Sequence, residues 1–177
     1  MPDQLTPHRA RAWRRTARLL ALLVLFPAAG LLAGYLWELW WQPVVGVVVE
    51  GELRFDLDAL GRDFSGTATY AVLALGAGVL LGLCAVALAG RDELATLAVV
   101  TIGSCAAALV MWQTGQQLGP PDPAPLVGAA ADGDRVSEQL TLASPGLLAL
   151  WPLASLTTLG TLFLVLPRRF PDTVESL

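Results

Sequence analysis

The sequence has no lysine, a single histidine and two cysteines, and each scarcity excludes some chemistry. The histidine, His8, stands near the N-terminus, ahead of every long apolar stretch. One chain therefore cannot build a histidine-based metal centre or a Ser-His-Asp triad within its apolar part. The cysteines, Cys84 and Cys105, are not in a Cys-x-x-Cys arrangement, which argues against a thiol oxidoreductase.

Charge is also missing from the longest apolar stretches. The nineteen residues from Leu19 to Trp37 carry none, and the chain of 177 residues is 55% hydrophobic with a mean hydropathy of +0.60. These values are too high for an ordinary soluble domain of this size, so we expect an integral membrane protein. Charged groups inside membrane helices mark ion paths and proton relays, and their absence here argues against a pump or coupled transporter.

Four apolar stretches of 19 to 25 residues predict four membrane-spanning helices. At about 1.5 Å per residue each can cross the hydrocarbon layer, and a helix satisfies the backbone groups that lipid cannot. The short turn 90–93 predicts an antiparallel hairpin of the second and third spans, with Asp92 as N-cap of the third. Ser144 and Pro145 predict the start of the fourth. The spans lie at about 17–41, 70–89, 94–112 and 147–166, between tails 1–16 and 167–177.

Two signals predict the orientation. Eight arginines lie on the side of the two termini and three on the other side, so the positive-inside rule places both termini in the cytoplasm. The first span runs on into 37–41 instead of ending at a cleavage site, so we expect an uncleaved anchor in the inner (plasma) membrane rather than a signal peptide. Aromatic residues at the outer ends of the spans predict an interfacial belt: Trp37, Trp40, Trp41, Tyr70, Trp112 and Trp151.

Two outer segments, 43–69 and 113–143, connect the spans. A valine run followed by alternating polar and apolar residues predicts a hairpin that turns near Glu50-Gly51. The proline-rich stretch 119–125 predicts an extended, irregular backbone, and the alternation over 135–142 predicts a further strand. The expected fold class is an all-α membrane protein, a four-helix antiparallel transmembrane bundle with a small extracytoplasmic β cap.

Five acidic residues cluster within 50–63. Asp56 and Asp58 occupy positions one and three of a pattern that begins like a calcium loop. The pattern then fails, because positions five and twelve hold Leu60 and Thr67 where oxygen ligands of the right kind are needed. We expect a solvated surface without metal ion or other cofactor, with an outer-face cation site at Asp56 and Asp58 as the alternative.

One acidic residue, Glu38, stands at the outer end of the first span between tryptophans. Acidic side chains at such a level are accommodated by the membrane interface. We expect an interfacial structural role for Glu38, with contact to a substrate or lipid as the alternative.

The two cysteines differ in depth. Cys84 lies about five residues from the inner end of its span and Cys105 about eleven residues from the inner end of the next. At about 1.5 Å per residue their depths differ by roughly 9 Å, which is too far for a relaxed disulfide. We expect two free thiols that act as small buried packing residues.

Small residues recur at intervals of four in the spans and form seams along the helices. Such seams let helix backbones approach closely, and they drive helix association in lipid. We expect packing within the monomer, with a partner or dimer surface as the alternative. The seam residues singled out are Gly30, Gly34, Gly78, Gly82 and Gly103.

Several short motifs carry a resemblance. The first span, after its basic N-terminus, ends in Trp-Glu-Leu-Trp-Trp-Gln-Pro (37–43), Asp63-Phe64 precedes a glycine-rich second span, and Leu150-Trp151-Pro152 opens the last. With Trp-Gln-Thr-Gly at 112–115, the chain resembles a family of uncharacterised actinobacterial four-span integral membrane proteins, a domain of unknown function. The resemblance implies an inner-membrane location and a four-helix build, and brings with it no activity or site residue.

The function expected from these patterns is that of a non-enzymatic accessory or scaffold protein of the cell envelope. It would bind a membrane-protein partner, or itself, through the helix seams and the β cap, with the lipid bilayer around it and no nucleic acid. A small transporter or channel component is the first alternative. An intramembrane enzyme acting on lipids is the second, and only the outer acidic segment offers it polar groups.

Overall fold

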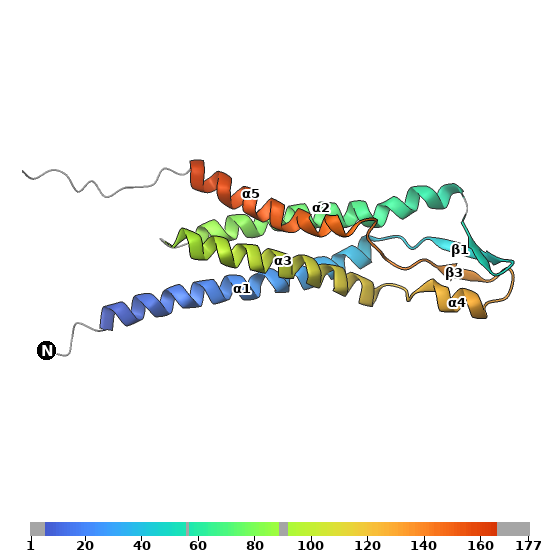
Figure 1. Cartoon of the computed structure of the whole chain (residues 1–177), viewed down its shortest axis with the longest axis horizontal. Helices are drawn as coiled ribbons and strands as arrows, with labels where there is room; N and C mark the ends of the chain where they lie inside the picture. Colours follow the sequence, from blue (N-terminus) through green and yellow to red (C-terminus); the bar gives the residue numbers. More distant parts are fainter. Residues whose placement is uncertain (1–5, 56, 89–91, 166–177) are drawn as a thin grey trace, which may run out of the picture.

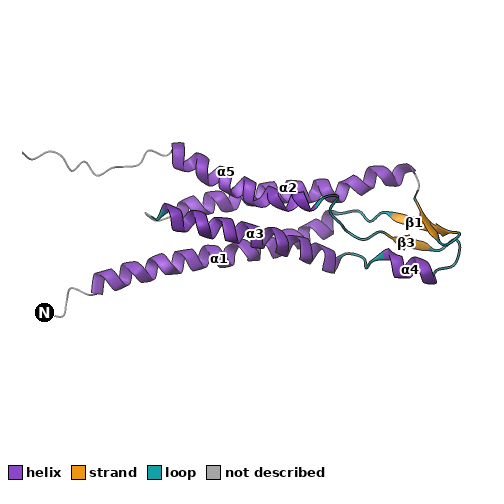
Figure 2. Cartoon of the chain, viewed as in Figure 1, coloured by secondary structure: helices purple, strands orange, loops and turns teal. Residues whose placement is uncertain are grey.

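Four long helices lie side by side, and a small β-sheet sits beyond one of their ends (Figure 1; Figure 2). This computed structural model describes residues 6–55, 57–88 and 92–165. We call the end of the bundle that carries the sheet the cap end, and the opposite end the base. The long helices are α1 (Thr6–Trp40), α2 (Leu57–Leu88), α3 (Glu93–Leu118) and α5 (Leu150–Val165), which follows a 3-10 turn, η1 (Pro145–Ala149).

All four long helices are long and apolar enough to cross a membrane, which confirms the predicted number of spans. The candidate membrane spans are Trp13–Trp40, Phe64–Leu88, Glu93–Ala129 and Pro145–Val165. The prediction was wrong for 57–69, which was expected to be part of a loop and is the beginning of α2. Hydropathy marks where lipid-compatible sequence begins, whereas leucine and alanine favour helix on either side of that boundary.

The closest helix pairs are α1 with α3 and α2 with α5. Gly30 faces Ala107 and Gly34 faces Met111, so residue numbers rise together and these two helices are parallel. The pair α2 and α5 is parallel for the same reason. The consecutive helices α2 and α3 run in opposite directions, as expected, but make few contacts with each other. Of the predicted turn 90–93, residues 90–91 lie outside the described residues, and Asp92 and Glu93 are described.

The interior of the bundle is filled by large apolar side chains. Phe26, Trp37, Met111 and Trp151 are fully buried and belong to one continuous core. A buried hydrogen bond joins the second helix pair, in which the Ser155 hydroxyl donates to a backbone carbonyl of α2 over 3.1 Å. Such interhelical bonds add modestly to the packing that holds membrane helices together.

The cap contains three strands, β1 (Val45–Val49), β2 (Glu52–Arg54) and β3 (Arg135–Ser137), in the order β2-β1-β3 with both pairs antiparallel. The predicted hairpin is confirmed, with Glu50 and Gly51 both at positive φ, 54° and 75°, as a two-residue turn of this kind requires. The predicted third strand exists but covers only three residues.

The proline-rich segment of the cap departs from the prediction in its second half, because a short helix, α4 (Pro123–Ala129), begins within the expected extended stretch. The Asp122 carboxylate accepts a hydrogen bond from the Ala124 N–H at 3.0 Å, and Pro123 occupies the first turn. Proline there needs no N–H partner and has a suitable φ, so an aspartate followed by proline starts a helix. Ser144 caps η1 as predicted, accepting from the Gly146 N–H at 3.3 Å.

Candidate functional site

The predicted seam in the first helix lies against α3. A Cβ atom on Gly30 would stand 2.6 Å from the Ala107 carbonyl oxygen, and one on Gly34 would stand 2.6 Å from the Met111 carbonyl oxygen. In return, a Cβ on Gly103 would meet the Phe26 ring at 3.0 Å. These glycines are therefore used for close backbone contact within the chain.

The seam in α2 is likewise occupied from within. A Cβ on Gly78 would stand 2.8 Å from the Ala154 Cβ, and one on Gly82 would stand 2.8 Å from the Thr158 Cβ. Sequence reasoning missed Gly115. A Cβ atom on this residue would overlap with the Trp37 ring. The signal was available, because Gly115 continues the interval of four that runs from Gly103 through 107 and 111.

Aromatic side chains fill the bundle at its cap end. The buried Trp37 indole donates its Nε1–H to the Gly66 carbonyl over 2.7 Å and meets the Tyr70 ring edge-on, with 5.1 Å between ring centroids. The Tyr70 hydroxyl and the Trp151 Nε1–H are buried and have no hydrogen-bond partner among the residues described. This cluster joins the helices at the level where the cap begins.

The predicted aromatic belt is therefore wrong for four of its members. Trp37, Tyr70 and Trp151 are fully buried in the core, and Trp41 is buried as well, whereas Trp40 is exposed as expected. Position along a helix sets the depth of a side chain, but the helix face decides whether it points to lipid or to protein.

Of the three predicted outer-face residues, the structure describes the side chain of Glu38 alone, so the cation site at Asp56 and Asp58 stays a prediction. Glu38 is half-buried near the cap end of α1. Asp56 lies outside the described residues, and Asp58 is placed only as backbone in the first turns of α2. Within 6–55, 57–88 and 92–165, no group of three or more His, Cys, Asp or Glu side chains could hold a metal ion.

Both cysteines are free thiols, as predicted, but the expectation that they are buried is wrong. Cys84 and Cys105 are exposed on the outside of the helices. Cys105 falls between Ser104, which is fully buried, and the next seam residue, so the helical repeat turns it away from the contact with α1. A small apolar thiol is compatible with lipid on that face.

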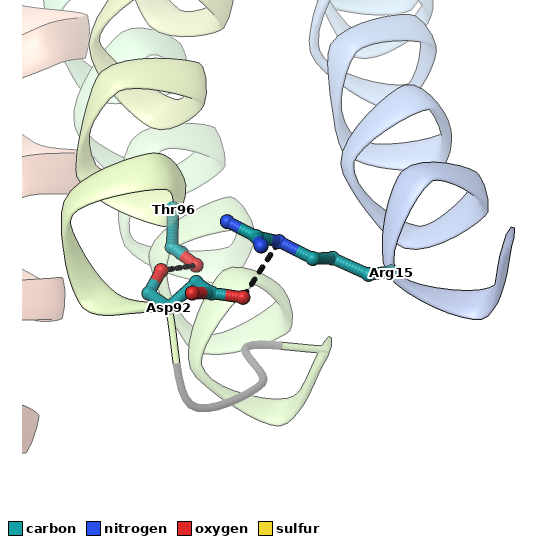
Figure 3. A network of polar contacts seen from close by, with 3 residues as sticks. All are labelled: Arg15, Asp92 and Thr96. Carbon is teal, nitrogen blue, oxygen red and sulfur yellow. Dashed lines mark hydrogen bonds and ion pairs between the residues drawn. The ribbon is translucent and has the colours of Figure 1, made fainter. Parts of the chain in front are cut away.

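An ion pair joins two helices near the base (Figure 3). The Arg15 Nε lies 2.6 Å from an Asp92 carboxylate oxygen, and the Thr96 N–H and hydroxyl both donate to the Asp92 carbonyl over 3.0 Å. Asp92 is the N-cap residue of α3, as predicted, but its side chain pairs with α1 and makes no capping hydrogen bond. Both charged side chains are about half exposed, so the pair aligns α1 with α3 but adds little stability.

A groove of about 450 Å³ lies in the cap between α4 and β3. Figure 1 shows β3 between β1 and α4 at the far end of the molecule. One wall comes from β3 and the other from the proline-rich segment and α4. The lining residues are Pro120, Pro121, Leu126, Ala130, Asp134, Arg135, Val136 and Ser137. Sequence reasoning predicted a strand here but did not place it at the edge of the sheet.

Searches of protein families, curated proteins and solved structures find no match to this chain. The resemblance to an actinobacterial four-span family thus stays a prediction. The fold defines the class as a multi-pass helical membrane protein with a three-stranded cap at one end of its bundle.

Proposed function

We propose that the protein is a non-enzymatic accessory or scaffold protein of the cell envelope, and that its cap binds a partner protein. The observation that carries the proposal is the groove beside β3, which lies beyond the cap end of a tightly packed bundle. A concave surface of several hundred Å³ with apolar walls and a few polar groups is typical of a binding site.

The partner surface proposed here is narrower than the one expected from the sequence. The glycine seams already serve contacts between helices of the same chain, so they are not free for another protein. The cap, by contrast, presents exposed apolar side chains, including those of Val45, Val47 and Leu126. Partner binding is therefore assigned to the cap alone.

We place the protein in the plasma membrane with its cap outside the cell and both termini in the cytoplasm. Arg14, Arg15 and Arg18 lie on the base half of α1, and eight of the eleven arginines belong in sequence to the two tails, the start of the first span or the turn between the second and third spans. The positive-inside rule then puts the base in the cytoplasm.

The alternative of a transporter or channel component is less well supported by the packing of the bundle. Phe26, Trp37, Met111 and Trp151 fill the space between the helices, where a single-chain path would have to run. A close-packed interior of this kind serves a rigid support better than a conduit.

In-membrane photocrosslinking tests the proposed function. A photoreactive residue at Leu126, in the groove, is expected to give a discrete adduct with another membrane or envelope protein in native membranes. The matched control is Leu31 on α1, which is 55% exposed against 46% for Leu126 and which we expect to face lipid. Equal adducts at both positions, or none at Leu126, would contradict the proposal.

A further inference from the structure

The edge of β3 that faces the groove has main-chain groups without a hydrogen-bond partner among the described residues. The Val48 N–H donates to the Asp134 carbonyl at 2.9 Å, and the Glu138 N–H donates to the Val44 carbonyl at 2.8 Å. In an antiparallel ladder the residues of one strand point alternately toward its neighbour and away from it. The N–H and C=O of Arg135 and Ser137 therefore point away from β1, toward the free edge.

The opposite wall of the groove does not satisfy this edge. Pro120 and Pro121 have no N–H to donate, and Leu126 of α4 presents an apolar side chain. An open strand edge is a template for an added strand from another chain, and main-chain hydrogen bonds supply much of the affinity of such complexes.

The positive charge of Arg135 at this edge favours an added strand that carries an acidic side chain. Arg135 is exposed and has no ion-pair partner among the described residues, whereas Arg54, across the sheet on β2, lies 3.7 Å from the Glu50 carboxylate. The Asp134 carboxylate, the acid nearest to Arg135 in sequence, already accepts from the Ala131 N–H at 2.9 Å. Arg135 is thus the cation left for an incoming group.

The register of the sheet places that cation on a defined face. Val47 is the cross-strand partner of Arg54 on one side and of Arg135 on the other, so the three side chains form one row on the exposed face. A residue of an added strand opposite Arg135 would continue this row. A carboxylate there would meet the guanidinium, and opposite charges across strands are favourable.

From this juxtaposition we infer that the β3 edge binds an extended segment of a partner protein as a fourth strand, with a carboxylate of that segment against Arg135. The inference rests on the proposed function and names how the cap holds its partner. Main-chain hydrogen bonds to Arg135 and Ser137 give the segment its register. Apolar side chains of the segment enter the groove against Leu126 and Val136.

Peptide binding to the full-length protein in lipid nanodiscs tests the inference. The probe is a short fluorescent peptide of alternating glutamate and valine, compared with a version that carries lysine for glutamate and one that is N-methylated at alternate amides. We expect the acidic peptide to bind, and both altered peptides to bind about tenfold more weakly or worse, because one loses the charge pair and the other the ladder.

Two variants and one matched control locate the site. Arg135→Glu is expected to weaken binding of the acidic peptide about tenfold and to strengthen binding of the lysine peptide. Arg54→Glu reverses a charge in the same row on the other edge strand, and should leave the affinity within about twofold. Ser137→Pro removes the outward N–H together with the serine hydroxyl, which an edge strand tolerates, and should also weaken binding. Tryptophan fluorescence checks that each variant is folded.

Several results would overturn the inference. If the N-methylated peptide binds as tightly as the acidic peptide, the peptide does not bind as an added strand. If Arg54→Glu weakens binding as much as Arg135→Glu, the site is not at β3. If no peptide binds, the inference is also wrong. The Leu126 adduct separates the two proposals. If the adduct persists in Arg135→Glu and Ser137→Pro, the proposed function stands but the partner does not bind as an added strand. If the adduct joins two copies of this chain, the partner is a second copy of the protein. If the parent protein gives no adduct, the proposed function itself is wrong.

Discussion

Two glycines in the same turn of α2 have different surroundings. A Cβ on Gly78 would press on α5, whereas a Cβ on Gly76 would meet no atom within 4 Å. The first glycine is needed for helix contact, and the second is not. Each glycine destabilises the helix by about 0.5–1 kcal/mol relative to alanine, because it loses more backbone entropy on folding.

Gly78→Ala is therefore expected to lower the free energy of unfolding by about 1–3 kcal/mol, because the added methyl group forces α2 and α5 apart. Gly76→Ala is the control, and should leave stability unchanged or raise it by about 0.5–1 kcal/mol. Unfolding by SDS in mixed micelles measures both. If the two variants behave alike, the contact between Gly78 and Ala154 does not hold the pair together.

The aromatic cluster at the cap end makes a second prediction about single residues. The Trp37 indole N–H is bonded to the Gly66 carbonyl, and the nearby Tyr70 hydroxyl is buried without a partner among the described residues. Trp37→Phe should lower the free energy of unfolding by about 1–3 kcal/mol, since it removes the buried hydrogen bond to the Gly66 carbonyl and loses packing.

Tyr70→Phe removes only the unsatisfied hydroxyl, so it should leave the free energy of unfolding unchanged or raise it. The same SDS unfolding assay compares the two variants. A large loss of stability in Tyr70→Phe would mean that the hydroxyl has a bound water or another partner that stabilises the fold.

At the scale of elements, the bundle is assembled from two parallel helix pairs, α1 with α3 and α2 with α5. The Arg15–Asp92 ion pair fixes the register of the first pair at the base, and the glycine contacts fix it further along. Arg15→Asp is expected to reduce the free energy of unfolding by no more than about 1 kcal/mol, and the swap with Asp92→Arg should recover most of the loss.

A double-mutant cycle in the SDS assay gives the coupling energy of this pair, which should shrink as salt is added. Such a surface pair contributes about 0.2–1 kcal/mol even with good geometry. A coupling of several kcal/mol would contradict the half-exposed positions of the two side chains.

The sequence predicted the elements better than their neighbours. Long apolar runs and caps such as Ser144 are local signals, and they placed four helices and the Glu50-Gly51 turn correctly. Which helix a seam meets depends on residues about 77 positions away, as with Gly30 and Ala107, and no local signal carries that information. For the same reason the burial of Trp37, the exposure of Cys105 and the edge position of β3 could not be predicted.

At the scale of the whole molecule, cap and bundle are joined through one short stretch of α2. The Gly66 carbonyl accepts from Trp37 of α1, and the Thr67 hydroxyl accepts at 3.3 Å from the Ala143 N–H, just after the cap returns to the bundle. Leu140 is buried against the same core. The cap is therefore held at a fixed place relative to the helices, which suits a surface that presents a strand edge.

The orientation of that surface decides which partners can reach it. Cys84 and Cys105 are exposed on the helices, so both can be replaced by alanine with little loss of packing, which leaves a background for single labels. In that background Ser137→Cys should react with a membrane-impermeant maleimide in intact cells, whereas Thr6→Cys should react only after permeabilisation. The reason is the excess of arginine at the base, which favours retention on the cytoplasmic side. The reverse labelling pattern would put the β3 edge in the cytoplasm, and the partner would then have to be sought among proteins of that compartment.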